Sequence, residues 1–520
     1  MQTPKQHEFV PIQLCGGQYG YFGLEKGIRR QLNLLSEIDF EQIDLLVNID
    51  GLPLYKSAEV HIWPILASFQ STSPFIVCLF CGNSKPTSVD LFLAHFLEEC
   101  QQLTTAGIEF KGQMLKFNFE AIIADSPARQ FLKCIKGHNG YNACERCTIY
   151  GIRVEHNMCY IGTEHAKRND SCFSSMKYHT NDQETTHQYR QSPLISYKFG
   201  CISKFPLDYL HLCLLGVVKR LIKYWESGPF RSCRIGSINF QRLSYLLSSL
   251  QGTFPNEFAR QPRELLQWKR YKAVEFKSFL LYSGIVQLKH ILASAYYDHF
   301  MLLSISFRIF LLPDSSERTP YLTQFANQLL IRFVEDSPRL YSKKFMSLNV
   351  HSLIHLYDDV NTFKCSLQKL SSFPFENFLQ VIKHLVRSSH NHIAQVFNRL
   401  TELDHCGGEL MRKTIYTKLV ASGKNSWFLL ENCKTYIQVV KILSSKTFSC
   451  KKFEKQNASD VFVKPCCSSL LNIVKFEEVQ LRNATLCTVD RSKLSRKCVH
   501  MQYNTSVILI PLISKVNWKT

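Results

Sequence analysis

The sequence predicts an α/β fold in which a mixed sheet is interrupted by a large helical insertion and followed by a small β-rich domain. Three observations lead to this expectation. Four apolar runs before residue 125 have the length of buried strands, and a helical pattern separates the third from the fourth. Residues 150–345 contain no further strand series and carry Leu, Phe and Tyr at helical spacing. From about residue 425, short β-branched runs alternate with polar loops.

The first part of the chain is expected to form three strands, a helix, a fourth strand and a further helix. The expected strands cover residues 43–50, 60–66, 75–81 and 115–124. The first strand is apolar apart from Asp44 and Asn48, as a buried strand would be. Ser88 is a suitable N-cap for the first helix. Pro127 lies where a proline fits best, within the first turn of the second helix.

A meander of three strands, a crossover helix and a parallel strand beside the first is the order of elements in the ribonuclease-H-like fold. That order puts the ends of the first and fourth strands side by side at the centre of the sheet. Asp50 and Asp125 occupy those ends. An Asp after a single apolar run is usually a turn residue. Two of them at neighbouring strand ends, joined by a carboxylate from a helix, suit a two-metal site.

The third carboxylate is expected from a helix that contains Glu376. This helix has an apolar stripe at i, i+3, i+4 and i+7, formed by Phe375, Phe378, Leu379 and Ile382. Glu376 lies beside the stripe, and carboxylates are hard ligands that suit Mg²⁺ or Mn²⁺. The sequence therefore predicts Asp50, Asp125 and Glu376 as metal-binding catalytic residues. The alternative for Glu376 is a solvent-facing residue in the first helical turn, where the helix dipole favours a negative charge.

Two cysteines and two histidines form a second set. Cys144 and Cys147 have the spacing at which two thiolates bind one tetrahedral Zn²⁺, and His351 and His355 place two imidazoles on one face of a helix. The four would form a structural zinc site across the insertion and hold the helix of Glu376 in register. A redox pair, without a thioredoxin-like context, and unrelated thiols with core histidines are the alternatives. The histidine pair lacks the Glu of a metalloprotease motif.

The expected domains follow from these elements. They are an N-terminal extension (1–42), a catalytic core (43–148 and 346–405), a mainly helical insertion (149–345) and a small basic β-rich domain (425–520). A chain of 520 residues is long enough for two to three compact units.

The net charge indicates an acidic partner. The chain has 62 Lys and Arg against 42 Asp and Glu, a formal charge of +20. Such an excess suits DNA or RNA, although some basic proteins bind neither. The excess is concentrated in residues 431–520, which hold 15 Lys and Arg against 6 Asp and Glu.

The cellular compartment is expected to be reducing. The N-terminus has no apolar core of a signal peptide, and the most apolar window, 300–307, is too short to cross a bilayer. We therefore expect a soluble intracellular protein that does not contact membranes. The 20 cysteines are then thiols or metal ligands rather than disulfides.

Three further features are expected to have weaker roles. The stretch 136–140 and the pair Asp208 and His211 have no chemistry that follows from their spacing. The residues after Glu376 form either a basic helix face along a DNA backbone or a solvated face; they are Lys383, His384, Arg387, His390 and His392.

Taken together, these motifs resemble the catalytic region of CACTA (En/Spm)-type transposases over roughly residues 40–400. The resemblance is carried by Ile49-Asp50-Gly51, Trp63-Pro64-Ile65, Asp125-Ser126-Pro127-Ala128-Arg129, Gly137-His138, Cys144-x-x-Cys147, Asp208-x-x-His211, Leu215-Gly216-Val217, Glu275-Phe276-x-x-Phe279-Leu280-Leu281-Tyr282 and Pro374-Phe375-Glu376-Asn377. Leu509-Ile510-Pro511-Leu512-Ile513 extends it more loosely into the β-rich tail.

The resemblance implies an Asp-Asp-Glu site that cuts DNA, as in the related catalytic subunit of the V(D)J recombinase. It implies Asp50, Asp125 and Glu376 as the catalysts that bind Mg²⁺ or Mn²⁺, and the four Cys and His residues as Zn²⁺ ligands. It also implies double-stranded DNA as partner, a homodimer on paired transposon ends, and the nucleus as location. Such transposases carry an N-terminal DNA-binding region, whereas 49 residues precede Asp50 here.

The expected function is that of a transposase, or a domesticated derivative, which hydrolyses a DNA phosphodiester and uses the freed 3′-hydroxyl for strand transfer. One alternative is a DNA- or chromatin-binding protein that keeps the fold and no longer cuts. A host nuclease of the same fold, without strand transfer, is the other.

Overall fold

The computed structural model describes residues 10–55, 60–70, 72–313, 315–405 and 417–517. Residues 1–9 of the expected N-terminal extension and 518–520 of the expected β-rich domain lie outside the described residues. The chain forms two compact units. Unit 1 comprises residues 1–160, 164–210 and 370–413, and unit 2 comprises 161–163, 211–369 and 414–520.

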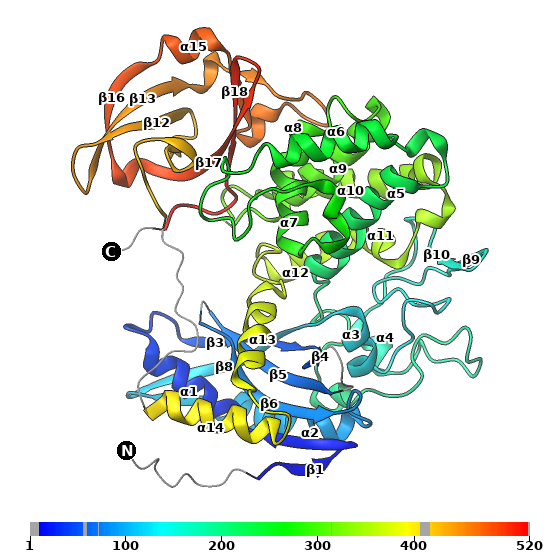
Figure 1. Ribbon diagram of the computed structural model, residues 1–520. Coiled ribbons are helices and arrows are strands. Elements are labelled where there is room, and N and C mark those ends of the chain that lie inside the picture. The colour runs from blue at the N-terminus through cyan, green and yellow to red at the C-terminus, as the bar shows by residue number, and fades with distance from the viewer. Residues whose placement is uncertain (1–9, 56–59, 71, 314, 406–416, 518–520) are drawn as a thin grey trace. The chain divides into compact units, whose positions relative to one another are not determined.

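Unit 1 is built on a mixed sheet with the strand order β1-β2-β6-β5-β3-β8-β7 (Figure 1). Its strands are β1 (Ile12–Leu14), β2 (Gly17–Tyr21), β3 (Gln42–Ile49), β4 (Leu52–Pro53, paired with β5), β5 (His61–Phe69), β6 (Phe75–Gly82), β7 (Ile108–Phe110) and β8 (Gln113–Ile123). Strands β3, β5 and β6 form an antiparallel meander, and β8 runs parallel to β3. The four predicted strands, and the place of the fourth beside the first, are therefore confirmed.

In the described part of unit 1, five longer helices accompany this sheet. They are α1 (Leu24–Leu34), α2 (Val89–Ala106), α3 (Ser126–Lys133), α13 (Phe373–Leu385) and α14 (His392–His405). Ser88 caps α2 as predicted, its side chain accepting a hydrogen bond from Leu91 N. Helices α1, α2 and α3 share one hydrophobic core with the sheet. Helix α14 packs against β2 and β6.

Several elements of unit 1 were not predicted. Strands β1 and β2 and helix α1 lie within the expected N-terminal extension, and β2 extends the sheet by pairing with β6. A hairpin of β9 (Ile152–Val154) and β10 (Asn157–Cys159) lies where no strand was expected. Each of its strands has only three residues, so neither produces the apolar run on which the prediction relied.

The larger part of unit 2 is helical, as predicted for the middle of the chain. Its main helical elements are η2 (Leu210–Val218), α5 (Lys219–Ser227), α6 (Ser237–Ser248), α7 (Ala273–Ser278), η5 (Phe279–Ser283), α8 (Gly284–Gln287), α9 (Ser294–Phe310), α10 (Pro320–Tyr341), α11 (Leu348–Ser352), η7 (Leu353–His355) and α12 (Leu356–Phe363). Of the helices that the structure describes, none is long and apolar enough to cross a membrane.

The C-terminal part of unit 2 is an antiparallel sheet, which confirms the predicted β-rich region. Its order is β14-β15-β18-β17-β11-β12-β13-β16. The strands are β11 (Trp427–Leu430), β12 (Thr435–Ile442), β13 (Thr447–Glu454), β14 (Ser459–Asp460), β15 (Val474–Phe476), β16 (Thr485–Asp490), β17 (Leu494–Tyr503) and β18 (Ser506–Pro511). Two buried cations of β17 pair with the helical part, Arg496 with Glu317 and Lys497 with Glu257.

The buried His299 is expected to make unit 2 sensitive to acid. Burial lowers the pKa of His299 to about 4, below the ordinary value of 6.5. The neutral ring is therefore the form that the folded state favours, and its stabilisation is complete above pH 6.5 and is lost as the pH falls towards 4. The shift corresponds to about 3 kcal/mol. Urea unfolding at pH 7 and pH 4 should show this loss in the wild type and a smaller loss in His299→Gln. Equal losses would contradict it.

Candidate carboxylate site and Cys and His pairs

Strands β3 and β8 bring Asp50 and Asp125 to the same edge of the sheet. The two strands are parallel neighbours, and Asn48 is paired with Ile123. Each aspartate lies two residues beyond its member of that pair. Neighbouring strands are about 4.8 Å apart, so the two residues leave the sheet side by side. The predicted adjacency of the two strand ends is confirmed.

The turn after β3 fixes Asp50. Its Oδ1 accepts a hydrogen bond from Gly51 N at 2.7 Å. A Cβ on Gly51 would come within 2.8 Å of the Trp63 ring, so a glycine is needed for this turn to pack on the indole. The close approach accounts physically for two motifs of the sequence, the glycine after Asp50 and the tryptophan of β5.

Asp125 has a structural contact besides its position at the strand end. It is the N-cap of α3, and its Oδ1 accepts a hydrogen bond from Ala128 N at 2.8 Å. Such a cap contributes about 1 kcal/mol. Capping uses one of the two carboxylate oxygens, so the same side chain can also offer an oxygen to a cation.

Glu376 lies in the first turn of α13, and its carboxylate approaches that of Asp50. One oxygen of each lies within 4.8 Å of the other. Two oxygens bound to one Mg²⁺ are up to about 4.2 Å apart, because each Mg–O bond is about 2.1 Å. The 4.8 Å is an upper bound that allows the two oxygens to share one ion, and Asp125 does not belong to this group of neighbouring ligand atoms. The predicted apolar stripe of α13 is buried as expected.

Asp208 is a positioning residue that the sequence analysis left without a role. It is 1% exposed, and its Oδ1 accepts hydrogen bonds from Leu210 N at 3.3 Å and Ser372 N at 3.0 Å. Leu207 forms a parallel bridge with Ala124, next to Asp125. Asp208 therefore ties the segment beside Asp125 to the start of the helix that carries Glu376.

Under the metal-dependent nicking proposed below, Asp208→Ala is expected to lower the rate about 10–100-fold, a loss comparable to that of other residues that position a metal ligand. It should also raise the Mg²⁺ concentration needed for half-maximal rate. Asp208→Asn keeps an acceptor for both N–H groups and should retain most of the activity. Plasmid-nicking rates across a Mg²⁺ titration measure both effects. An Asn variant as impaired as the Ala variant would contradict a positioning role through these hydrogen bonds.

A buried ion network connects the Cys-x-x-Cys loop to α3. Glu145 accepts hydrogen bonds from Arg129 Nε and Lys133 Nζ, both at 2.8 Å. Burial alone would raise the pKa of Glu145, but Arg129 and Lys133 more than offset this and hold the pKa at about 2. Arg129 also donates to Ala124 O at 2.5 Å. The loop of the two cysteines is thus linked to the residue before Asp125.

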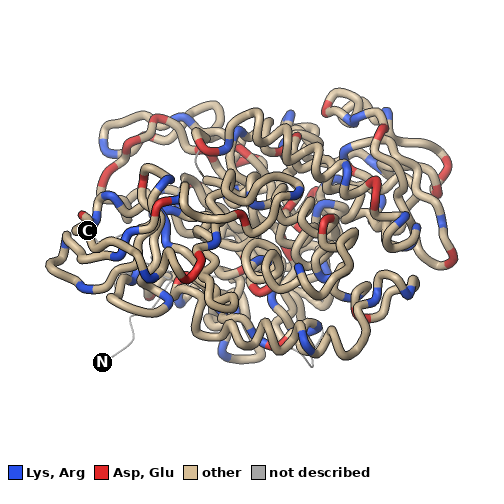
Figure 2. The backbone as a smooth tube through the Cα atoms, turned by 90° about the horizontal axis from the view of Figure 1, so that it is seen from above, with Lys and Arg blue, Asp and Glu red and all other residues tan. Residues whose placement is uncertain are grey.

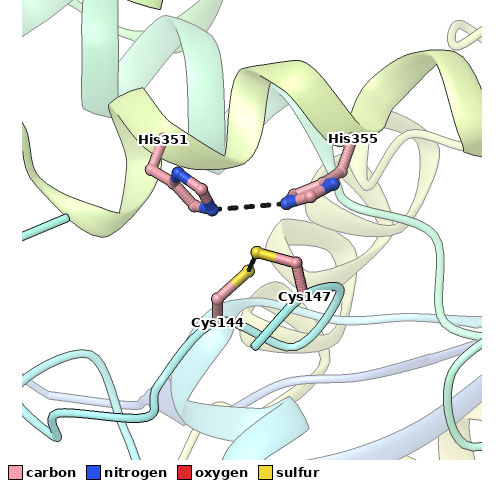
Figure 3. A group of neighbouring side chains, drawn as sticks. All are labelled: Cys144, Cys147, His351 and His355. Carbon is pink, nitrogen blue, oxygen red and sulfur yellow. Dashed lines mark hydrogen bonds between the residues drawn. The ribbon is translucent and has the colours of Figure 1, made fainter. Parts of the chain in front are cut away.

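The two cysteine sulfurs have a spacing that suits zinc. Cys144 Sγ and Cys147 Sγ are 3.6 Å apart and buried (Figure 3). Two thiolates on a tetrahedral Zn²⁺ are about 3.8 Å apart, because each Zn–S bond is about 2.3 Å. Arg168 Nε lies 3.0 Å from both cysteine carbonyl oxygens, and its single N–H is shared between them, which fixes the loop. The Cys144 thiol and burial raise the pKa of Cys147, and a divalent cation reverses such an effect by stabilising thiolates.

The two histidines also have the spacing of ligands. His351 on α11 and His355 on η7 are buried, and their Nε2 atoms are 3.3 Å apart on one side of the helix (Figure 3). Two nitrogens on a tetrahedral Zn²⁺ are separated by about 3.3 Å. His351 Nδ1 lies 3.2 Å from Gly162 O. A proton on Nδ1 donated to that carbonyl leaves Nε2 as the ligand atom.

The expected basic face after Glu376 is partly wrong. Helix α13 ends at Leu385, so Arg387 and His390 lie beyond it. His392 begins α14 and is buried, with its Nδ1 3.6 Å from Cys81 Sγ and its Nε2 3.2 Å from Tyr55 Oη. It packs α14 against β6 instead of facing solvent.

One family model matches the chain. It describes a domain of unknown function (DUF8592) and covers residues 404–512. That range holds the C-terminal sheet, β11 to β18. None of the seven candidate site residues lies within it. Among curated proteins, none matches the chain.

Proposed function

We propose that the protein is a DNA transposase, or a domesticated derivative, that cuts and joins DNA at a site formed by Asp50, Asp125 and Glu376. A single observation carries the proposal. Parallel neighbouring strands end in two aspartates, and helix α13, which is distant in sequence, brings a third carboxylate within 4.8 Å of the first. The antiparallel meander with a parallel strand beside its first member supports a ribonuclease-H-like fold, which we propose for unit 1.

The three carboxylates would hold Mg²⁺ or Mn²⁺, for which their oxygens are suitable ligands. When bound, a metal pair about 4 Å apart supplies both activation of the attacking hydroxyl and stabilisation of the leaving oxygen. The contribution of the chain is positioning. Two aspartates on rigid strand ends fix one side of the site, and Asp208 holds the start of α13 so that Glu376 completes it.

We further propose that Cys144, Cys147, His351 and His355 bind one structural Zn²⁺. All four are buried, and each offers one ligand atom. Each pair by itself has the separation expected of two ligands on a tetrahedral ion. A buried thiol pair or imidazole pair alone would leave a tetrahedral Zn²⁺ two ligands short, whereas the two pairs together supply a full set.

Double-stranded DNA is the partner that this chemistry requires, and the nucleus is the corresponding location. Lys and Arg are spread along the chain with Asp and Glu between them (Figure 2). The formal net charge of the chain is +20. A positive excess favours binding to the DNA backbone in a salt-dependent way. A homodimer on paired transposon ends would be the working assembly.

Nicking of supercoiled plasmid by the wild-type protein tests the proposal. We expect nicking in Mg²⁺ or Mn²⁺ and none in EDTA. Joining of a labelled oligonucleotide 3′ end to the plasmid would distinguish a transposase from a nuclease. Plasmid that is bound by folded, zinc-loaded protein and stays intact would favour the non-catalytic DNA-binding protein instead.

A further inference from the structure

A polar cavity of about 400 Å³ lies in unit 1 beyond the C-terminal half of α3. Its lining includes Gln130 of α3, Lys136, Asn139 and Tyr141 of the following loop, and Arg153 of the β9–β10 hairpin. The volume falls within the range of small-molecule sites, about 300–1,000 Å³. Neither the carboxylate site nor the zinc ligands contribute to this lining.

The loop that forms this cavity is held rigidly. Tyr160 Oη lies 2.6 Å from Gly140 O and 3.0 Å from His138 O, and its single proton is shared between the two carbonyls. Gly140 N donates to Gly137 O at 2.8 Å, and Gly151 N donates to Tyr141 O at 2.7 Å. A cavity fixed in this way loses little conformational entropy when it takes a ligand.

One of the lining residues, Tyr141, belongs to an aromatic pair. The rings of Tyr141 and Tyr150 are stacked, with centroids 5.1 Å apart and an angle of 11° between their planes. The Arg153 guanidinium lies 5.8 Å from the Tyr141 centroid. Tyr150 is 50% exposed, so part of its ring is accessible to a ligand. Stacked aromatics with an exposed member are a common surface on which nucleic-acid bases stack.

The polar groups of the cavity suit a nucleotide better than a bare anion. Lys136 and Arg153 supply positive charge, while Glu184 also lines the cavity and opposes a purely anionic ligand. The amides of Gln130, Asn139 and Gln183 offer both donors and acceptors. A nucleobase presents donors and acceptors on its edge, and its phosphate accepts from the two cations.

We propose that this cavity, with Tyr150 as its stacking surface, binds an unpaired nucleotide of a DNA strand. The choice of DNA rests on the proposed function. Gln130 is five residues beyond Asp125, which is about 8 Å along the axis of α3. That distance is about two nucleotide steps of B-DNA. The cavity therefore lies where a strand that passes Asp125 can place a nucleotide displaced from the duplex.

Fluorescence anisotropy with a labelled single-stranded oligonucleotide tests the proposal on the full chain. Tyr150→Ala should weaken binding about tenfold or more, because stacking on an aromatic contributes about that factor per base. Arg153→Ala should weaken it as well. Tyr150→Phe keeps the ring and should bind like the wild type. Tyr321→Ala, a tyrosine 78% exposed on α10, is the matched surface control.

A 2-aminopurine placed in a single-base bulge reports stacking directly. Its fluorescence should be quenched by the wild type and by Tyr150→Phe, and not by Tyr150→Ala. Unchanged affinity and unchanged quenching in Tyr150→Ala would overturn the proposal. Tighter binding of an RNA strand of the same sequence would overturn the assignment to DNA.

The proposal for the cavity and the proposal for the carboxylate site can be contradicted independently. Single-strand binding that depends on Tyr150, with no nicking by the wild type, would support the cavity and contradict the proposed cutting. Nicking that depends on Asp50, with single-strand binding indifferent to Tyr150, would contradict the cavity alone. Asp50→Ala should lose nicking and retain single-strand affinity if both proposals hold.

Discussion

Asp50→Ala and Glu376→Ala are each expected to abolish metal-dependent nicking of DNA. Each change removes a proposed direct ligand of the metal pair, and the two carboxylates lie within 4.8 Å of one another. The loss should exceed the roughly 10–100-fold that removal of an outer-shell partner costs. The measurement is the initial rate of conversion of supercoiled to nicked plasmid in Mg²⁺, repeated in Mn²⁺.

The remaining carboxylate, that of Asp125, needs a different substitution. Asp125 also caps α3, so Asp125→Ala removes a cap as well as a charge. Asp125→Asn keeps a side-chain acceptor for Ala128 N and removes only the charge, since Asn is as good an N-cap as Asp. We expect Asp125→Asn to lose nicking while its thermal unfolding stays close to that of the wild type.

Asp44 provides the matched control for these variants. It lies on β3, the strand that leads to Asp50, and it accepts hydrogen bonds from Gln42 and Asn118 away from the strand end. Asp44→Ala should nick DNA at a rate near that of the wild type. Nicking that survives Glu376→Ala would show that the third carboxylate is another residue, and nicking that survives Asp50→Ala would contradict the whole site.

Cys144→Ser and His355→Ala are expected to remove a stoichiometric zinc and to lower stability severely. Structural Zn²⁺ contributes about 10–16 kcal/mol of apparent binding free energy in small zinc domains, so its loss is not compensated locally. Bound zinc, measured by plasma mass spectrometry, should fall from one per chain to none. The thermal unfolding midpoint should fall in the same variants and in wild-type protein treated with a chelator.

Cys172→Ser is the control for the zinc prediction. Cys172 lies in unit 1 on the short helix α4 (Asp170–Ser174), is partly exposed and is not one of the proposed ligands. This variant should retain one zinc. A His355→Ala variant with a full equivalent of zinc would contradict the split Cys₂His₂ site, and wild-type protein purified without zinc under non-chelating conditions would contradict any zinc site.

The central sheet and its two aspartates could be predicted because the signals are local and strong. Strands β3, β5, β6 and β8 are long apolar runs, and the crossover through α2 allows few arrangements other than a parallel β8 beside β3. The adjacency of Asp50 and Asp125 follows from that pairing. The helical position of Glu376 could be predicted because the stripe of α13 marks a helix that packs on one face.

The role of Asp208 and the burial of Glu145 and His392 could not be predicted, because each depends on contacts with residues distant in sequence. The role of Asp208 arises because its carboxylate meets Ser372 N, 164 residues further along the chain. Glu145 is buried because Arg129 and Lys133 neutralise it, which the spacing of the cysteines does not show. His392 belongs to a polar stretch, and only its contacts with Cys81 and Tyr55 reveal that it is buried.

Iron-directed cleavage of the polypeptide tests the account's central claim most directly, namely that Asp50, Asp125 and Glu376 bind metal at one place. Fe²⁺ replaces Mg²⁺ at carboxylate sites, and with ascorbate and peroxide it cuts the backbone beside its ligands. The account predicts fragments that end near residues 50, 125 and 376, all lost together in Asp50→Ala and suppressed by excess Mg²⁺. Cleavage confined to other segments, or cleavage near these residues that persists in Asp50→Ala, would contradict it.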